Sequence, residues 1–402
     1  MARRGLSLLR GGFAALGPNR HRFCFDSAAL ASQTFSGTRS TCDLALFRGT
    51  LALTQAKRAM GEAVAHNQLK PLRILFCGDE FPAAEFYTRK NLQQYPHLHL
   101  DSCPRTLVAD RIGDYDICVP RMMRLDAEVI ARAKQLQLIV QFGVGLEGVD
   151  IEAATRAGIK VARIPSVNTG NALACAEHCI YMMLGLLRHQ RVMASSIAAK
   201  RLGEPAGSTL YGKTIFILGY GHIGKELALR LRYFGVHLLA VRRSWTSLRG
   251  SQNGALPNTS DDEDFVNEKG GSERILEFAS RADIVVTCCT LNPSTKGIID
   301  ATFLSAMKKG AYVVNIARGG LLDYDAVLAG IESGHLGGLA IDVAWTEPFD
   351  PTDPILQHPN VLITPHVGGV TDLSYQAMGK IIAETAHQLS VGMPTTGIEV
   401  VN

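Results

Sequence analysis

A short apolar stretch at residues 214–218 runs directly into a glycine-rich turn, and this junction constrains the fold more than any other feature of the chain. The turn reads Gly219-Tyr220-Gly221-His222-Ile223-Gly224, and a helical pattern follows it over 225–234. Continuous apolar strands occur where a parallel sheet is covered on both faces. A Gly-x-Gly-x-x-Gly turn between such a strand and a helix cradles a pyrophosphate on backbone N–H groups. The sequence therefore predicts a dinucleotide-binding domain.

The end of the next expected strand indicates which dinucleotide this domain would bind. The strand pattern ends in Arg242-Arg243-Ser244, and no acidic residue lies between Glu226 and Asp261. Selection of NAD usually requires a carboxylate about 20 residues beyond the turn, where it accepts hydrogen bonds from the ribose. Guanidinium groups at that place favour a ribose 2′-phosphate instead. We therefore favour NADP(H), with NAD(H) as the alternative if the segment that follows supplies an acid.

Short apolar runs alternate with amphipathic stretches along most of the chain, as expected for parallel sheets with helical crossovers. The pattern predicts an α/β fold with doubly wound sheets. Residues 246–271 interrupt it with many polar side chains, and we interpret them as a flexible surface insertion. Strands are expected at 73–77, 116–119, 136–142, 159–164, 214–218, 237–241, 283–289, 311–315, 338–342 and 361–364, and helices at 83–95, 126–134, 173–187 and 225–234.

The N-terminal segment has the composition of a targeting peptide rather than of a folded region. Residues 1–25 contain five arginines and no acidic residue, which is typical of an organellar transit peptide. We expect residues 1–65 to lie outside the fold, with the mitochondrion slightly favoured over the chloroplast. A disordered tail or a misassigned start codon is the alternative, and the protein would then be cytoplasmic.

The rest of the composition argues against several classes of partner. A net charge of +4 over 402 residues gives no electrostatic reason to expect a nucleic acid. The apolar runs are all shorter than the ~18 residues of a membrane-spanning helix, so no membrane partner is expected. Cys175 and Cys179 could share a helix face, but we interpret them as small buried apolar residues and expect no metal site.

Three polar residues follow consecutive strands in the second half of the chain. Arg318 lies in a glycine-rich turn, and Glu347 and His366 each come a few residues after an apolar run. Open α/β sheets bind their ligands at the carboxyl ends of the strands. We therefore expect these three side chains to meet in one site.

Four motifs occur in a fixed order, and together they are far more specific than any one of them. They are the turn at 219–224, Ala317-Arg318-Gly319-Gly320, Glu347-Pro348, and Pro365-His366-Val367-Gly368-Gly369. In this order and spacing they resemble the D-isomer-specific 2-hydroxyacid dehydrogenase family, which includes glyoxylate/hydroxypyruvate reductases and phosphoglycerate dehydrogenases. The resemblance covers roughly residues 70–400.

The resemblance implies hydride transfer between NAD(P)H and a small 2-keto or D-2-hydroxy acid, and we expect a glyoxylate/hydroxypyruvate-type reductase. Hydride addition leaves negative charge on the keto oxygen, so a proton must be delivered there. His366 suits this role because imidazole titrates near neutral pH, and an ionised Glu347 would favour the protonated ring. Arg318 would bind the substrate carboxylate and polarise the keto oxygen. These three are the expected catalytic residues.

Further site residues follow from the resemblance, position by position. Gln141-Phe142-Gly143-Val144-Gly145 resembles the segment whose backbone N–H groups hold the substrate carboxylate. Asn171 and Glu177 match a recurrent pattern on the interdomain helix, with a helix cap and an ion-pair partner as the alternative roles. The expected substrate-binding residues are Val144, Gly145 and Arg318, and the expected cofactor-binding residues are Gly219, Tyr220, Gly221, His222, Ile223, Gly224, Arg242, Arg243, Ser244, Thr290, Asn292, Ile316, Ala317, Asp342, His366 and Gly368.

The resemblance also implies the domain organisation. Two Rossmann-like domains with a cleft between them are expected. Residues 70–170 and 370–402 would form a discontinuous substrate domain, and residues 171–369 the NAD(P)-binding domain. A homodimer is expected as well. The pattern of 119–124 matches nothing we can assign, and we expect a solvated loop there. Binding of a phosphate or a second carboxylate by Arg121 or Arg124 is the alternative.

Three other functions remain as alternatives. One is a phosphoglycerate-dehydrogenase-like enzyme that uses NAD. Another is a formate dehydrogenase, although that family pairs its histidine with glutamine rather than with a residue such as Glu347. The last is a dinucleotide-sensing protein that resembles the C-terminal-binding corepressors, which the apparent transit peptide disfavours.

Overall fold

The computed structural model describes residues 69–78, 81–245 and 265–402. These residues all belong to one compact unit, His66–Asn402. The predicted transit segment, residues 1–65, and most of the predicted insertion lie outside the described residues. None of the helices in the described ranges is both long and apolar enough to span a lipid bilayer.

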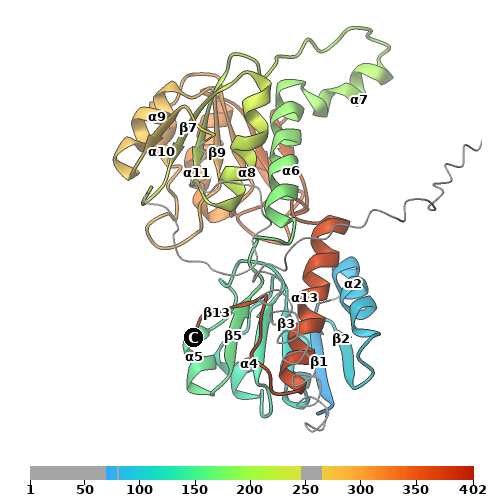
Figure 1. The fold of residues 1–402 in the computed structure, drawn as a ribbon. Coiled ribbons are helices and arrows are strands. Elements are labelled where there is room, and N and C mark those ends of the chain that lie inside the picture. Colours follow the sequence, from blue (N-terminus) through green and yellow to red (C-terminus); the bar gives the residue numbers. More distant parts are fainter. Residues whose placement is uncertain (1–68, 79–80, 246–264) are drawn as a thin grey trace, which may run out of the picture. The chain divides into compact units, whose positions relative to one another are not determined.

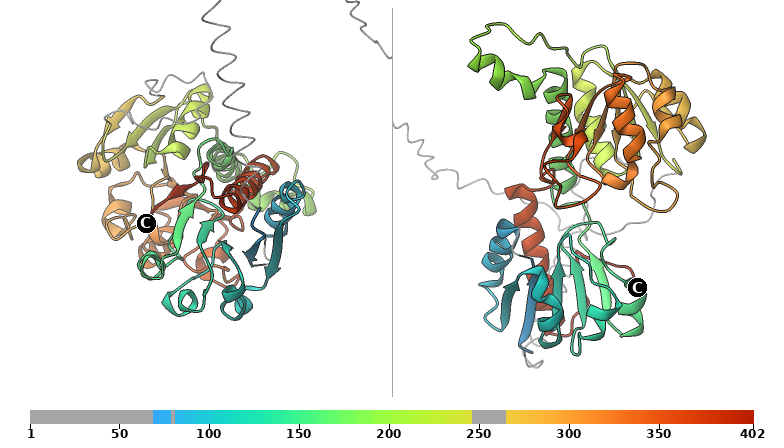
Figure 2. Two further views of the ribbon diagram at one scale, coloured as in Figure 1. Left: turned by 60° about the horizontal axis from the view of Figure 1, so that its bottom comes forward. Right: turned by 180° about the vertical axis from the view of Figure 1, so that it is seen from behind.

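The first half of the chain forms a six-stranded sheet with the order β13-β5-β4-β3-β1-β2. Its strands pair in parallel except for β13, which runs antiparallel to β5 and returns the C-terminus of the chain to this sheet. Helices α2 (Pro82–Leu92) and α13 (Asp372–Ser390) lie side by side against it (Figures 1 and 2). The strands are β1 (Leu72–Cys77), β2 (Leu98–Cys103), β3 (Ile117–Pro120), β4 (Leu138–Gln141), β5 (Lys160–Arg163) and β13 (Glu399–Val400).

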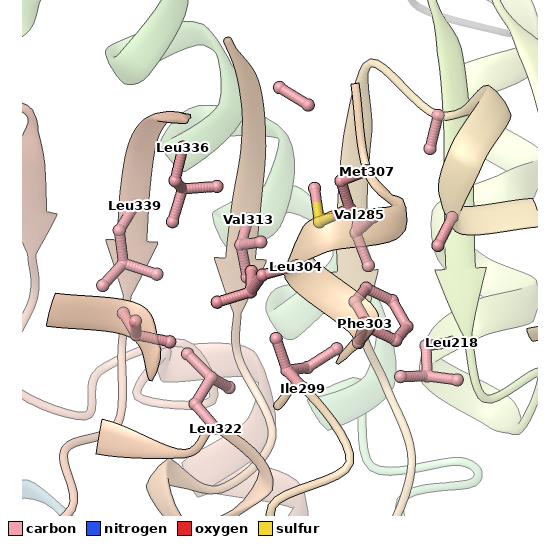
Figure 3. Close-up of a cluster of buried hydrophobic side chains, with 14 of the residues drawn as sticks. Leu218, Val285, Ile299, Phe303, Leu304, Met307, Val313, Leu322, Leu336 and Leu339 are labelled. Atoms are coloured by element: carbon pink, nitrogen blue, oxygen red, sulfur yellow. The ribbon is translucent and has the colours of Figure 1, made fainter. Parts of the chain in front are cut away.

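The second half forms a seven-stranded sheet with the order β12-β11-β10-β9-β6-β7-β8, and every pairing is parallel. Buried aliphatic side chains from β6, β9 and β10 pack against Phe303 and Leu304 of helix α10 (Ala301–Ala306) (Figure 3). The strands are β6 (Thr214–Leu218), β7 (His237–Val241), β8 (Glu268–Gly270), β9 (Ile284–Thr287), β10 (Ala311–Asn315), β11 (Leu336–Ile341) and β12 (Val361–Ile363). The two sheets confirm the predicted α/β class with two Rossmann-like doubly wound units.

Most of the longer helices connect parallel strands and cover the sheets. The α-helices are α2 (Pro82–Leu92), α3 (Val108–Arg111), α4 (Ala127–Ala131), α5 (Ile151–Arg156), α6 (Asn171–Leu187), α7 (Gln190–Ala198), α8 (His222–Leu231), α9 (Ile275–Arg281), α10 (Ala301–Ala306), α11 (Tyr324–Glu332), α12 (Pro354–Gln357) and α13 (Asp372–Ser390). Short 3-10 helices are η1 (Arg105–Leu107), η2 (Ile112–Asp114), η3 (Arg232–Phe234), η4 (Ser272–Arg274) and η5 (Gly319–Leu321).

Several helices have a side-chain cap at their N-terminus, whereas helix α8 has none. An aspartate side chain accepts a backbone N–H at the start of α4, α5, α10, α11 and α12, which satisfies one of the N–H groups that a helix start leaves unpaired. Helix α8 begins at His222, and its N-cap residue, Gly221, has no side chain to cap it. Its first N–H groups are therefore available to a ligand.

Two expectations from the sequence are wrong in part. The predicted flexible insertion is too long at its C-terminal end, because Glu268–Gly270 forms the edge strand β8 and pairs with β7. Arg274 and Arg281 of the following segment pair with the Glu268 carboxylate and anchor that strand. The loop after β3 is not solvated throughout, because Arg121 is buried whereas Arg124 is exposed.

Candidate active site

The glycine turn after β6 has the geometry that a bound pyrophosphate requires. Gly219 adopts φ +107°, and a Cβ there would lie 2.6 Å from the backbone nitrogen of Cys289. A Cβ at Gly224 would lie 2.6 Å from the carbonyl oxygen of Gly219, so α8 packs closely on the turn. A Cβ at Gly221 would meet nothing within 4 Å. The open space at Gly221 and the uncapped start of α8 therefore fit the phosphates of a dinucleotide.

Positive charge gathers at the start of α8. Partial burial lowers the pKa of His222, and the charges of Lys225 and Arg242 lower it further. Arg242 directly follows β7, and its backbone N–H donates to the carbonyl of Gly270 in β8 at 3.0 Å. Its guanidinium thus belongs to a segment anchored beside the turn, whereas Arg243 is exposed.

The Tyr220 side chain is buried in the core beside this turn. It retains 1% of its accessible surface and packs 5.2 Å from the Trp245 ring, measured between centroids. Only the backbone of Tyr220 is therefore available to a cofactor. Ile223, the other apolar residue of the turn, packs against the same core.

His366 and Glu347 form a direct pair after β12 and β11. The His366 Nδ1 atom lies 2.9 Å from Glu347 Oε2, and both side chains are partly exposed. Glu347 Oε1 accepts the backbone N–H of Ala344 at 3.0 Å. Glu347 is thus held at both oxygens, which fixes the imidazole with its Nε2 atom free for another partner.

Asp342 organises the loop that carries His366. His366 has φ +54°, a left-handed conformation that costs a non-glycine residue energy. The buried Asp342 carboxylate accepts the N–H groups of Val367 and Gly368, at 2.9 and 2.8 Å. It also accepts the Thr364 hydroxyl at 2.6 Å. Asp342 therefore binds both sides of the strained residue and holds it in place.

Hydrogen bonds keep Asp342 ionised in spite of its burial. Burial acts to raise the pKa of its carboxyl, but bonds from His178, Thr364 and the loop N–H groups outweigh it, and the net pKa is lowered. His178 Nε2 lies 3.3 Å from Asp342 Oδ1 and 2.9 Å from the Thr364 hydroxyl. Sequence reasoning missed both His178 and Thr364 as supports of the site.

A buried amide holds the turn that presents Arg318. Asn315, which has no exposed surface, donates to the carbonyl of Arg318 at 2.8 Å and accepts the Ala317 N–H at 3.1 Å. Thr287 of the neighbouring strand donates to the same amide oxygen at 2.7 Å. Asn315 is a polar residue at the end of an otherwise mostly apolar strand. That position could have marked it as a support of the site, but sequence reasoning assigned it no role.

The Arg318 guanidinium already contacts a carboxylate. Its Nε atom lies 3.2 Å from Glu147 Oε1, and its Nη1 donates to the carbonyl of Ala317 at 2.7 Å. A Cβ at position 145 would overlap the ends of the Arg318 and Glu147 side chains, so Gly145 lies directly against this ion pair. Arg318 and the predicted substrate-binding residues Val144 and Gly145 therefore lie together. Glu147 was not expected from the sequence.

The other predicted cofactor contacts border the carboxyl ends of the strands. Thr290 and Asn292 follow β9 in a tight turn, where Asn292 Oδ1 accepts the Ser294 N–H at 2.9 Å. The Asn292 side chain is thus already engaged. Ile316 is buried at the end of β10, and Gly368 packs against the Asp342 carboxylate.

The residues on α6 take structural positions. Asn171 is the first residue of α6, and its side-chain oxygen lies against Gly369. Glu177 is exposed and lies 3.7 Å from Arg230, so the ion-pair role fits it. Cys179 is buried, and burial raises the pKa of Cys175 to about 12. No group of three metal-ligating side chains occurs among the residues that the structure describes.

The chain is similar in sequence to one family of protein domains and to several curated enzymes. Residues 180–368 match the pattern of the D-isomer specific 2-hydroxyacid dehydrogenase NAD binding domain. The chain is 32% identical to D-3-phosphoglycerate dehydrogenase of Bacillus subtilis over 289 residues, which cover 71% of this chain and 51% of that protein. It is 33% identical to the enzyme of that name from Methanocaldococcus jannaschii over 293 residues, 70% of this chain and 51% of that one. The chain thus spans about half the length of the curated relatives it matches.

Solved structures share the fold over most of the chain. The TT0316 protein of Thermus thermophilus matches with a TM-score of 0.67 and 27% identity, over 82% of this chain and 100% of that one. The pyruvate reductase of Chlamydomonas reinhardtii matches with a TM-score of 0.68 and 23% identity, over 82% and 99%. Because the identity is only 23%, this similarity supports the shared fold and nothing further. Since the sequence pattern, the relatives and the geometry of the site agree, the chain belongs to the D-isomer-specific 2-hydroxyacid dehydrogenase family.

Proposed function

We propose that the protein is an NADP(H)-dependent oxidoreductase that reduces a small 2-keto acid to the D-2-hydroxy acid. The observation that carries this proposal is the His366–Glu347 pair, with Nδ1 and Oε2 2.9 Å apart. Both residues follow strands of the sheet that also carries the phosphate turn. A proton donor at that edge is what reduction of a keto group needs.

Different residues of this chain would perform different parts of the reaction. When bound, the dinucleotide supplies the hydride. Arg318 binds the substrate carboxylate and polarises the keto oxygen, helped by the backbone N–H groups of Val144 and Gly145. His366 donates its proton to the oxygen as negative charge develops there. Glu347 stabilises the imidazolium, and Asp342 keeps the loop of His366 in place.

The preference for NADP(H) rests on Arg242. Arg242 directly follows β7, the strand beside the one that leads into the phosphate turn, and the adenosine ribose of the cofactor would lie at that strand end. A guanidinium there favours a 2′-phosphate over two ribose hydroxyls. NAD(H) is the alternative cofactor.

Glyoxylate and hydroxypyruvate are the first substrates to test. A second candidate activity is oxidation of D-3-phosphoglycerate with NAD. The names of the two relatives described above favour it.

We also propose a homodimer and an organellar location. Helix α7 and the loop after it leave several large apolar side chains exposed: Val192, Met193, Ile197, Leu202 and Tyr211. Apolar surface of this kind is typical of an interface between subunits. The basic, acid-poor composition of residues 1–25 supports import into mitochondria first and chloroplasts second. Light scattering would test the dimer, and imaging of a fusion of residues 1–65 to a fluorescent protein would test the location.

The decisive experiment follows oxidation of NADPH and NADH side by side with a panel of 2-keto acids. Turnover with a clear NADPH preference is the expected result. Turnover only in the reverse direction, with NAD and D-3-phosphoglycerate, would favour the second candidate. Binding of either dinucleotide without turnover in either direction would overturn the proposed activity.

A further inference from the structure

One face of helix α6 lies along the loop of residues 364–369, which carries the proposed proton donor. At the start of the loop, Met182 Sδ lies 4.0 Å from the Thr364 hydroxyl. At its end, the Asn171 side chain lies against Gly369. These helix residues belong to a row at the spacing i, i+4, i+7 and i+11, which places them on one side of α6. The row consists of Asn171, Cys175, His178 and Met182.

His178 contacts two of the groups that hold this loop in place. Its Nε2 atom lies 2.9 Å from the Thr364 hydroxyl oxygen and 3.3 Å from Asp342 Oδ1. The Thr364 hydroxyl donates its single proton to Asp342 Oδ1 at 2.6 Å. The proton for the contact between His178 and Thr364 must therefore come from the imidazole, so Nε2 carries the hydrogen and donates it.

Asp342 connects this contact to the backbone of the loop. Its Oδ1 atom accepts the Thr364 hydroxyl and the Val367 N–H, and its Oδ2 atom accepts the Gly368 N–H at 2.8 Å. A Cβ at Gly368 would lie 2.8 Å from Asp342 Oδ2 and 3.5 Å from the His178 ring, so the loop approaches both side chains closely. The imidazole, the hydroxyl and the carboxylate thus form one chain of hydrogen bonds that ends on the loop.

The loop needs this support because its backbone is strained at His366. This residue has φ +54°, a conformation that costs a non-glycine residue energy. The supports are shielded from solvent, since the side chains of Asp342 and His178 retain 3% and 15% of their accessible surface. Little water can therefore replace the imidazole as a donor to Thr364. Without that donor the Thr364 oxygen would lose a partner, and its hydroxyl would lose its fixed direction.

We propose that His178 is a positioning residue for His366. By donating to Thr364 it directs the Thr364 hydroxyl at Asp342, and Asp342 in turn holds the strained loop. The inference rests on the proposed function, in which His366 donates the proton. It assigns a kinetic role to a residue of α6 that acts only through other residues.

The test replaces His178 in the full chain and uses the best substrate of the 2-keto acid panel, with glyoxylate and hydroxypyruvate tried first. His178→Leu removes the N–H donor and keeps a side chain of similar size. It should lower kcat about tenfold. The pH above which kcat falls should decrease by about half a unit, because a looser loop weakens the His366–Glu347 pair. The Kd for NADPH should change by less than about threefold, since the phosphate turn is a separate part of the site.

Two further variants separate the hydrogen bond from packing. His178→Gln places an amide nitrogen where it can donate to Thr364, so kcat should stay within about threefold of the wild type and the pH profile should be restored. Met182→Leu is the packing control, because Met182 is fully buried on the same face of α6. This exchange of apolar side chains of similar volume should leave kcat and the pH profile unchanged.

Thr364→Val tests whether His178 acts through Thr364. It removes the hydroxyl and should lower kcat and shift the pH profile at least as much as His178→Leu. The double variant should be no slower than Thr364→Val alone, because both residues belong to one chain of hydrogen bonds. Hydrogen exchange at the Val367 amide should accelerate in each of these variants without any substrate present. If His178→Leu loses NADPH binding and is therefore misfolded, Thr364→Val and His178→Gln decide the matter.

The outcomes distinguish this inference from the proposed function. If His178→Leu lowers kcat without shifting the pH profile and His178→Gln does no better, His178 is a packing residue, and the inference fails while the reductase stands. An unchanged kcat in Thr364→Val, or losses that multiply in the double variant, would have the same meaning. If the wild type binds NADPH but reduces no keto acid of the panel, the proposed function fails and the inference fails with it.

Discussion

Glu347 divides its two carboxylate oxygens between His366 and the backbone. Oε2 lies 2.9 Å from Nδ1 of the imidazole, and Oε1 accepts the Ala344 N–H at 3.0 Å. The carboxylate cannot rotate without losing one of these partners, so the ring keeps one orientation. The Nε2 atom is therefore the nitrogen that can deliver a proton to a substrate. This relationship makes the function of the pair testable by single substitutions.

Replacement of His366 by alanine should lower kcat by about 10³-fold, because it removes the proton donor of the reaction. The phosphate turn is a separate part of the site, so NADPH should still bind, as followed by its fluorescence. Glu347→Gln, which keeps the size of the side chain, should lower kcat less. If His366→Ala instead weakened NADPH binding and left kcat at saturating NADPH nearly unchanged, His366 would be a cofactor ligand and not the proton donor.

Replacement of Arg318 by alanine should lower kcat/KM for the keto acid by at least about 100-fold, since a charge-assisted pair with the carboxylate is lost. The effect should appear in both KM and kcat, because Arg318 binds the carboxylate and also polarises the keto oxygen, and dinucleotide binding should be retained. Steady-state kinetics at saturating NADPH measure both constants. Unchanged kinetics would remove Arg318 from the substrate site.

Glu147→Gln tests whether the ion pair with Arg318 competes with the substrate. Both side chains are partly exposed, so the pair is weak, and its loss should lower KM by no more than about fivefold while kcat stays the same. The neighbouring substitution Glu152→Gln serves as a control on another exposed carboxylate of this region. A rise in KM for Glu147→Gln would mean that Glu147 orients Arg318 rather than competing for it.

Arg242→Asp should reverse the cofactor preference, because a carboxylate repels a 2′-phosphate and accepts bonds from the ribose hydroxyls. The ratio of kcat/KM for NADPH to that for NADH should fall on the order of 100-fold. Arg243→Asp makes the same change at the exposed neighbour, and it should move the ratio far less. A ratio unaffected by Arg242→Asp would refute the 2′-phosphate argument.

Asp342→Asn should destabilise the protein by about 1–3 kcal/mol at pH 7, because an amide cannot accept all the hydrogen bonds of the carboxylate. The pKa of Asp342 is lowered in the folded state. Its contribution is therefore complete above the unfolded value of about 3.9 and is lost as the pH falls through the folded value. Urea unfolding should show a constant difference between wild type and variant from pH 6 to 8.

The same variant should also loosen the loop of His366. Hydrogen exchange at the amides of Val367 and Gly368 should accelerate, since both donate to Asp342. Equal protection in both proteins would show that Asp342 does not hold this loop.

Much of the fold was readable from local patterns. The strand before Gly219 is apolar from Ile215 to Leu218, and the close packing of Gly224 on Gly219 is a contact within a few residues. Arg318, Glu347 and His366 could be named because each follows a buried strand, and parallel strands carry their carboxyl ends to one edge. What each residue does there remains a prediction that the substitutions above would test.

Long-range contacts decided the rest. Strand β8 has the sequence Glu-Lys-Gly, which carries no apolar pattern, and it forms because β7 offers a free edge and because Arg281 binds Glu268. Asp342 could be read as a cofactor contact, but its hold on the loop of His366 depends on pairing between β11 and β12.

The sequence by itself determined the class of fold, the phosphate turn and the polar residues of the site, since these depend on short-range periodicity and spacing. The tertiary structure alone decided the burial of Arg121. Its neighbours in sequence, Pro120 and Met122, do not predict it, and the rings that enclose it come from residues 81, 142 and 375. Burial is a property of everything packed around a side chain, so no local pattern can report it.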